Sequence, residues 1–202
     1  MVIERRPRYD DYDHYIQHQK NKTSSSKLRK RLQSKFEGKV KKFKSRFQHL
    51  KEEKIISDGD TVLCFGARMG EEVAAFREMN MNAIGVDLVP NLPLVEEGDF
   101  NNLKYKDSSH DIIYTNSLDH AWESKVFFDS VHRILKSEGV FIIDVFPGEG
   151  NYSAYEALFI GSDKDVENEV CEKGRFELLK RSTKLPNLQR RHKEIQLVFK
   201  KR

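Results

Sequence analysis

Cysteine is scarce in this chain, and long apolar runs are missing. The 202 residues include two cysteines, Cys64 and Cys171, whose separation fits neither a disulfide framework nor a metal-binding spacing. This usage favours a reducing compartment. Residues 1–10 are charged and lack an apolar stretch, and no run in the sequence is long enough to span a bilayer. We therefore expect a soluble, cytoplasmic protein.

Several signatures of common enzyme classes are also missing. The sequence has no Ser/His/Asp ordering typical of a hydrolase and no Walker-type phosphate loop. It contains no internal repeat and no clustered spacing of metal ligands, so we expect no metal site. These absences direct attention to sites built from glycine turns and single acids.

Charge is abundant but unevenly distributed. Charged residues make up 34% of the chain and the formal net charge is +4. Residues 20–54, which we call the basic arm, hold 14 Lys or Arg and 3 acids, a net charge of +11. The rest of the chain holds 22 basic and 29 acidic residues, a net charge of −7. The sequence thus describes an acidic domain that carries a basic arm.

The N-terminal quarter divides into two predicted segments. Residues 1–22 show no sustained period and are expected to form a flexible N-terminus. Residues 23–54 predict a basic amphipathic helix and a connector, and the polar run Thr23-Ser24-Ser25-Ser26 can cap the helix. Its apolar stripe consists of Leu28, Leu32, Phe36, Val40, Phe43, Phe47 and Leu50. Two interpretations stay open: the helix packs on a sheet, or its basic face binds RNA or an anionic membrane surface.

Residues 61–87 predict a strand, a glycine turn, a helix and a second strand that ends in an acid. Gly66 would supply the positive φ that a sharp strand-to-helix turn needs, and Gly70 would allow a close approach. Free N–H groups at the start of the helix would point at a ligand over the turn. Asp87 ends the second strand, where a carboxylate can accept hydrogen bonds from a ribose. This pattern is one half of a nucleotide-binding α/β fold.

The remaining chain predicts further alternating strands and helices. Only residues 88–93 separate Asp87 from a short third strand at 94–96, too few for a normal crossover helix. Strands are predicted at 111–115, 140–146, 175–183 and 194–200, and helices at 152–160 and 163–172. A helix before 140 is expected to end at Gly139 in a left-handed cap. Residues 147–150 are expected to form a loop on the ligand side.

The order of these blocks resembles class I S-adenosylmethionine-dependent methyltransferases, especially the small type 11 group. The resemblance covers roughly residues 58–145 and is carried by the "GVD", "GDF", "NSLDH" and "RILKSEG" blocks. It implies a doubly wound, mostly parallel seven-stranded sheet, followed by an antiparallel strand pair, over residues 55–202. It also implies S-adenosyl-L-methionine as the cofactor. The residues that it places at the cofactor are Gly66, Ala67, Gly70, Asp87, Leu88, Asp99, Phe100, Asn116, Ser117 and Leu118.

Roles follow from the resemblance for several of these positions. Asp99 would accept from the exocyclic amine of adenine and Phe100 would lie along the ring. The Gly66 turn would hold the methionine end. In the loop after the fourth strand, His120 could take a proton from a substrate while Asp119 orients it. The alternative for His120 is a helix cap or packing beside Trp122.

Two departures from the family pattern bear on activity. Cys64 stands where the family usually has an acid, and Arg68 replaces the middle glycine of the turn. The main hypothesis is methyl transfer to an unidentified acceptor. A second hypothesis is a methyltransferase-like domain that has lost catalysis and binds a partner. A third is a nicotinamide-dependent oxidoreductase, in which the "GDF" and "NSLDH" blocks would have no role.

Overall fold

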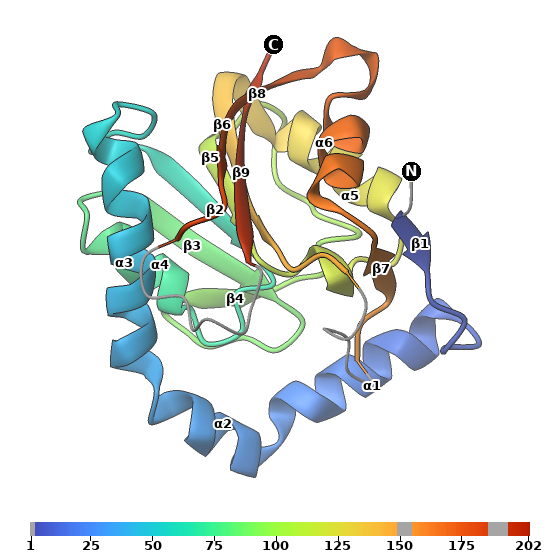
Figure 1. The fold of residues 1–202 in the computed structure, drawn as a ribbon. Coiled ribbons are helices and arrows are strands. Elements are labelled where there is room, and N and C mark those ends of the chain that lie inside the picture. Colours follow the sequence, from blue (N-terminus) through green and yellow to red (C-terminus); the bar gives the residue numbers. More distant parts are fainter. Residues whose placement is uncertain (1–2, 149–154, 186–193) are drawn as a thin grey trace.

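A computed structural model describes residues 3–148, 155–185 and 194–202. Its centre is a seven-stranded sheet with strand order β4-β3-β2-β5-β6-β9-β8. Only β9 runs antiparallel to its neighbours, so the mostly parallel, doubly wound sheet that the sequence predicted is confirmed (Figure 1). The strands are β2 (Thr61–Phe65), β3 (Asn82–Asp87), β4 (Val95–Glu97), β5 (His110–Thr115), β6 (Leu135–Val145), β8 (Phe176–Ser182) and β9 (Ile195–Lys201).

Helices cover both faces of this sheet, and the alternation of side chains along each strand supplies two apolar cores. Val62 and Cys64 of β2 join a core with α3 (Phe36–Glu52) and α4 (Glu71–Arg77). Leu63 and Phe65 join the opposite core with α5 (Ser124–Ile134) and α6 (Asp163–Val170). This period of two is what a strand buried on both faces requires. Cys64 is therefore a core residue, and burial raises the pKa of its thiol.

The connection from β3 to β4 contains no helix, as the short spacing predicted. Residues 88–94 form bends and turns, and β4 still pairs in parallel with β3 through Gly85 and Val95. Gly70 explains how so short a connection fits beside the turn. A Cβ atom on Gly70 would lie 2.7 Å from the Cβ of Leu94, so the missing side chain makes room for this loop.

Residues 3–22 form a strand and most of a helix, which corrects, for these residues, the expectation that residues 1–22 are a flexible terminus. Within the described residues, β1 (Ile3–Arg5) is followed by α1 (Tyr12–Ser24), whose N-cap Asp11 accepts from the backbone N–H of His14 at 2.8 Å. Tyr15 is only 2% exposed. Residues far along the chain hold α1 in place, and these long-range contacts cannot be seen in local periodicity.

The predicted single basic helix is two helices, α2 (Ser26–Gln33) and α3. Ser25 caps α2, accepting from the backbone N–H of Leu28 at 3.5 Å. The hydroxyl of Ser34 donates to the carbonyl of Arg31 at 2.9 Å, a side-chain bond that competes with helix continuation. Beyond the break, Val40, Phe43, Phe47 and Leu50 are buried on the sheet, so the packing interpretation of the apolar stripe is confirmed for α3.

Two further predictions are corrected by the structure. Gly139 does not end a helix: α5 ends at Ile134, and the positive φ belongs to Glu138. Gly139 is needed because a Cβ there would lie 2.9 Å from the carbonyl oxygen of Lys136. The predicted helix at 152–160 lies partly outside the described residues. Its last part is a strand, β7 (Leu158–Ile160), which pairs antiparallel with β1.

A buried ionic cluster joins α3 to the sheet. Arg46 is fully buried and donates to Asp144 of β6 at 2.7 Å and to both carboxylate oxygens of Glu194. Asp144 also accepts from Tyr114 and Gln196, each at 2.8 Å. Burial raises the pKa of Asp144, and the Arg46 charge opposes that rise. The cluster fixes α3, and with it the side chains that α3 directs toward the carboxyl edge of the sheet.

Candidate functional site

The turn after β2 has the conformation that the sequence predicted. Gly66 has a φ of +67°, and a Cβ there would lie 2.7 Å from the Cβ of Ser117. The backbone N–H groups of Gly66 and Ala67 donate to the carbonyl of Val86 at 2.9 and 3.2 Å. The turn is therefore held against the ends of β3 and β5, at the edge where parallel sheets bind ligands.

Asp87 and Asp99 are positioned by backbone donors. Asp87 accepts from the N–H of Arg68 at 3.0 Å and from that of Val89 at 3.1 Å. Burial raises the pKa of Asp87, while these two hydrogen bonds and the Arg68 charge lower it. Asp99 accepts from the N–H of Asn101 at 2.9 Å and from the hydroxyl of Tyr12.

These acids face a common space, which we call the inner cavity. Its volume is about 40 Å³. It brings together six of the residues predicted to bind the cofactor: Gly66, Asp87, Leu88, Asp99, Phe100 and Ser117. Arg68, Asn101 and His120 also line it. Phe100 stacks on Phe65 with ring planes 5° apart, which fixes the aromatic wall of the cavity.

Helix α1 closes the inner cavity, and sequence reasoning missed it. Tyr15, Ile16, Gln19 and Thr23 line the cavity from α1. The hydroxyl of Tyr15 donates to the backbone carbonyl of His120, and the amide of Gln19 donates to that of Tyr155, both at 2.5 Å. The signal was present in the sequence. Tyr12, Tyr15, Gln19 and Thr23 are spaced by three and four residues, which places them on one face of a helix.

A larger space, the outer cavity, lies beside the turn and has a volume of about 300 Å³. Gly66, Arg68, Ser117 and His120 line both cavities, so the two adjoin. The residues that line only the outer cavity are Lys39, Lys42, Phe43, Ala67, Glu71, Glu72, Asn116, Asp119, Phe146 and Glu194. The outer cavity is thus rich in charge, with Phe43 and Phe146 as its apolar walls.

Several charges of the outer cavity are paired. Lys39 donates to Glu71 at 2.8 Å, and Lys42 lies 3.6 Å from Glu194. Glu72 is 3% exposed, and its burial, with the neighbouring Glu71 charge, raises its pKa to about 8. At neutral pH Glu72 is therefore mostly protonated and can donate a hydrogen bond.

Asp119 and His120 have opposite pKa shifts. Burial, and then the charge of Glu156, raises the pKa of Asp119 to about 7. Burial, and then the charges of Lys22 and Arg68, lowers the pKa of His120 to about 3. Among the described residues, no hydrogen bond joins the side chains of Asp119 and His120. The expected orientation of His120 by Asp119 therefore has no hydrogen bond behind it.

Asp119, His120 and Glu156 offer ligand atoms that lie within 4.8 Å of one another. A metal ion could be held there, although the sequence had shown no such cluster, because Glu156 is far from the other two in the chain. Positive charge is already present: Arg6 lies 3.6 Å from Glu156, and the Lys22 ammonium interacts with both acids. The acids are therefore balanced by protein cations, and no metal role is assigned to them.

Two predicted cofactor residues lie apart from the cavities. Leu118 is 1% exposed and packs in the core on the α5 side. Gly70 faces Leu94 and lines neither cavity. Loop residues 149–150, expected at the substrate mouth, lie outside the described residues. Within those residues, no helix has both the length and the apolar character needed to cross a membrane.

Comparison with known proteins agrees with this fold. Residues 63–143 match the family model described as "Methyltransferase domain". No curated protein has a sequence that matches significantly.

Solved structures share the fold at low identity. One is the complex between the Haloferax volcanii Trm112 methyltransferase activator and a putative methyltransferase. It is 15% identical with a TM-score of 0.66, covering 83% of this chain and 94% of that one. Another is Burkholderia thailandensis 1,6-didemethyltoxoflavin-N1-methyltransferase with bound 1,6-didemethyltoxoflavin and S-adenosylhomocysteine. It is 16% identical with a TM-score of 0.65, covering 98% of this chain and 94% of that one.

A third similar structure is an S-adenosylmethionine-dependent methyltransferase from Clostridium acetobutylicum, 15% identical with a TM-score of 0.61, covering 80% of this chain and 91% of that one. TM-scores of 0.61–0.66 show that these proteins share the fold of this chain. Residues 63–143 thus match the methyltransferase-domain model, and the chain shares its fold with solved S-adenosylmethionine-dependent methyltransferases.

Proposed function

We propose that the protein transfers a methyl group from S-adenosyl-L-methionine to an acceptor at the outer cavity. The observation that carries the proposal is the convergence of Asp87 and Asp99 on one cavity beside Gly66. Asp87 would accept from the ribose hydroxyls, and Asp99 from the adenine amine. The methionine end would extend along Gly66 toward Asn116 and Ser117, which line the outer cavity. The S-adenosylhomocysteine in the Burkholderia enzyme supports this cofactor.

The chemistry needs little from the protein beyond position. The methyl group of a sulfonium is already electrophilic, so the acceptor atom must lie in line with the sulfur–methyl bond. Alignment of this kind lowers a barrier by about 7–11 kcal/mol in favourable cases. The cation of Arg68, which lines both cavities, would face the methionine carboxylate. Its presence in the glycine turn is thus compatible with cofactor binding.

If the acceptor arrives protonated, Asp119 fits the role of the base better than His120. A general base works best when its pKa lies near the working pH. The pKa of Asp119 is about 7, whereas that of His120 is about 3. His120 would then be a neutral wall of the site, and Asp119 would take the proton. This reverses the roles that the sequence suggested for the two residues.

Cofactor entry would require α1 to move. Sites for small molecules usually have volumes of about 300–1,000 Å³, whereas the inner cavity has about 40 Å³. The Tyr12 hydroxyl donates a hydrogen bond to the carboxylate of Asp99, which is the acceptor proposed for the adenine amine. Adenosyl binding and the observed seat of α1 therefore compete for the same carboxylate.

Titration calorimetry with S-adenosylhomocysteine tests the proposal. Asp87→Ala should weaken binding at least about 10-fold, because a hydrogen bond to a charged group contributes about 1.5–3 kcal/mol. Asp107→Ala is the matched control, since Asp107 is 74% exposed and pairs with Arg133 at the surface. Unchanged affinity in Asp87→Ala would disprove the ribose assignment.

The same titration separates the other two hypotheses. If the wild-type chain binds neither S-adenosylmethionine nor S-adenosylhomocysteine, the non-catalytic partner module is favoured. Binding of NAD alone would favour the oxidoreductase.

A further inference from the structure

The basic arm (residues 20–54) is placed around the carboxyl edge of the sheet. Lys20 at the end of α1 lies 3.2 Å from Glu97 at the end of β4. Arg29 of α2 donates to Asn91 at 2.8 Å, and Lys39 of α3 pairs with Glu71 beside the glycine turn. Helices α1, α2 and α3 therefore frame the edge that carries both cavities (Figure 1).

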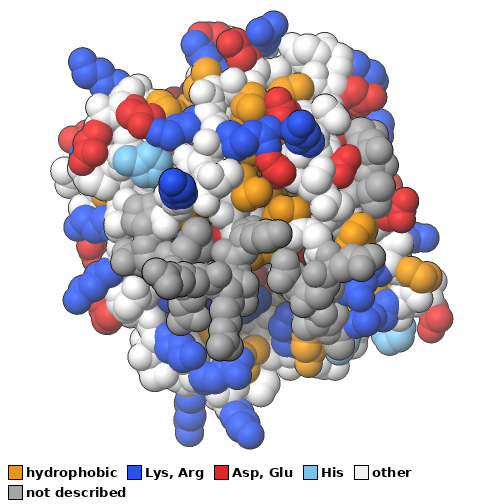
Figure 2. All heavy atoms as spheres, viewed as in Figure 1, with side chains coloured by type: hydrophobic (Ala, Val, Ile, Leu, Met, Phe, Trp, Pro, Cys, Tyr) orange, Lys and Arg blue, Asp and Glu red, His pale blue; other side chains and the backbone are white. Residues whose placement is uncertain are grey.

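Part of this arm is positively charged without any partner in the described chain. The exposed cations Lys27, Lys30, Arg31, Lys35 and Lys41 form no ion pair or hydrogen bond through their side chains with a described residue. Helix α2 contains no acid at all. Figure 2 shows Lys and Arg side chains gathered at the bottom of the view, where α2 lies in Figure 1.

The spacing of these cations suits a chain of phosphates. Lys30 and Arg31 follow Lys27 by three and four residues, which places the Cβ atom of each about 5–6 Å from that of Lys27. When unpaired Lys and Arg side chains neutralise the phosphates of a nucleic acid, the counterions condensed on those phosphates are released. This release drives nucleic-acid binding.

A membrane surface is a poorer partner for the arm. An interfacial helix must insert apolar side chains between lipids. On α2, Leu32 is buried and Leu28 is half-buried. The large exposed apolar side chains of the described chain are Leu92, Val126 and Leu179, none of which belongs to the arm.

We propose that the basic arm binds the backbone of a single-stranded nucleic acid and that one of its bases is the methyl acceptor. The acceptor part rests on the proposed methyl transfer. The sulfur–methyl bond of the cofactor would break as a bond forms between a base nitrogen and the methyl group. S-adenosylhomocysteine would leave, and the proton of that nitrogen would pass to Asp119, which lines the same cavity. A cavity of about 300 Å³ admits one unstacked base and excludes a duplex. Phe43 and Phe146 line it and would contact the base, and Lys39 and Lys42 of the arm itself also line it.

The test measures the fluorescence anisotropy of a labelled random 20-nucleotide pool, as RNA and as DNA, over a range of KCl. The variant is Lys27→Gln/Lys30→Gln/Arg31→Gln. Each phosphate contact on a single strand contributes about 0.7 to the slope of log K against log salt. Three lost contacts should lower the slope by about 2, which is about a 100-fold loss of affinity at 0.1 M salt.

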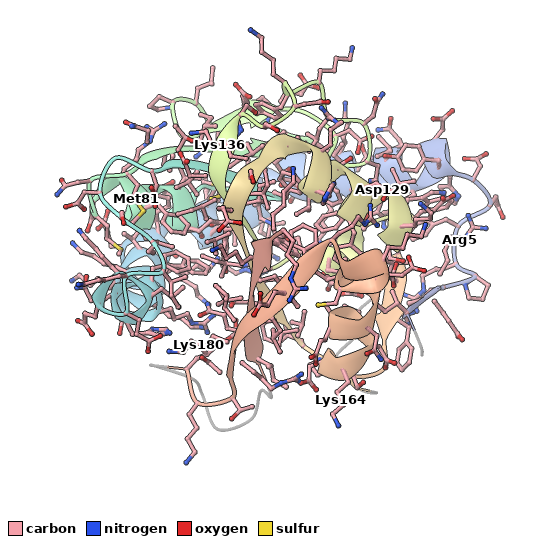
Figure 3. The ribbon with its side chains drawn as sticks, turned by 90° about the horizontal axis from the view of Figure 1, so that it is seen from above. Arg5, Met81, Asp129, Lys136, Lys164 and Lys180 are labelled. Atoms are coloured by element: carbon pink, nitrogen blue, oxygen red, sulfur yellow. The ribbon has the colours of Figure 1, made fainter. Side chains whose placement is uncertain are left out.

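The control is Lys106→Gln/Lys164→Gln/Lys173→Gln, which removes the same charge from exposed lysines outside the arm. Lys164 projects from the surface at α6 (Figure 3). Circular dichroism verifies that both variants are folded. Equal losses in the two variants, or no binding of either pool by the wild-type chain, overturn the surface assignment. Tighter binding to phosphatidylserine vesicles than to both pools also overturns it.

Transfer of a labelled methyl group from the cofactor to the pools tests the acceptor assignment. Incorporation into RNA or DNA that falls with the arm variant supports it and identifies the polymer. Nucleic-acid binding without incorporation, in a protein that binds S-adenosylhomocysteine, overturns it. If S-adenosylhomocysteine does not bind, the proposed methyl transfer fails, whereas the measured binding by the arm still decides the surface assignment.

Discussion

The buried cluster of Arg46, Asp144 and Glu194 yields a sharp prediction about stability. All three side chains are at most 4% exposed. Replacing Arg46 by Met keeps the volume roughly constant but leaves Asp144 buried without a cation and Glu194 with only Lys42, which lies 3.6 Å away. Breaking a buried ion pair in this way costs about 3–5 kcal/mol. For a chain of this length the unfolding midpoint should fall by about 6–20 °C.

The loss should depend on pH in a defined direction. Burial already raises the pKa of Asp144, and removing the Arg46 charge raises it further. A carboxyl whose folded pKa exceeds its unfolded value favours the folded state at low pH and loses that contribution as the pH rises through the folded pKa. The deficit of Arg46→Met relative to wild type should therefore be smaller at pH 5 than at pH 8.

Urea unfolding at pH 5 and pH 8 measures both effects. Lys44→Met is the matched control on the same helix, because Lys44 pairs with Glu78 at the surface at 3.0 Å and should contribute less than about 1 kcal/mol. Adding Glu194→Gln to Arg46→Met should recover part of the loss. A deficit no larger than that of the control, or one that does not shrink at pH 5, would refute the reasoning.

Three other predictions concern the site. Tyr12→Phe frees Asp99 and should raise affinity for S-adenosylhomocysteine about 5-fold by calorimetry, since a hydrogen bond contributes about 1 kcal/mol; weaker binding would mean that Tyr12 helps to hold the cofactor. The pKa of Glu72 is about 8, so its contribution to stability falls by about 4–5 kcal/mol as the pH rises from 4.5 to 8. Glu72→Gln should flatten that dependence in urea unfolding, and an unchanged profile would contradict the assignment. In Gly66→Ala the new Cβ atom would lie 2.7 Å from the Cβ of Ser117, on a residue whose φ is +67°. The free energy of unfolding should therefore fall by about 1–3 kcal/mol, and equal stability would show that the turn relaxes.

Local periodicity was sufficient for most of the sheet. The stretch at 61–87 specifies β2, α4 and β3 because its apolar positions and glycines fix each element within a few residues. The meeting of Asp87 and Asp99 was also predictable, because the carboxyl ends of parallel strands lie at one edge. The break between α2 and α3 depends on a hydrogen bond of the Ser34 side chain, and the need for glycine at position 139 depends on one close backbone contact. Periodicity encodes neither of these contacts.

The contacts that hold α1 over the site were not predictable in this way. Tyr12 contacts a residue 87 positions away, and Tyr15 contacts one 105 positions away. Glu156 reaches Asp119 and His120 from the segment before β7. Such pairings follow from the tertiary arrangement, so a helix whose own apolar period is weak, like α1, is easily taken for a disordered tail.

The pairing of β1 with β7 has a consequence for how the site opens. Strand β1, which precedes the helical segment, pairs with β7, and Arg46 of α3 holds the other end of that segment to the sheet. Because both of its ends are held, the segment that contains α1, α2 and α3 can move outward to admit a ligand without separating from the domain. Closing of α1 over the site is then an intramolecular step whose rate is independent of protein concentration. Cutting the chain between β1 and α1 would leave the helical segment held to the domain at its C-terminal end only.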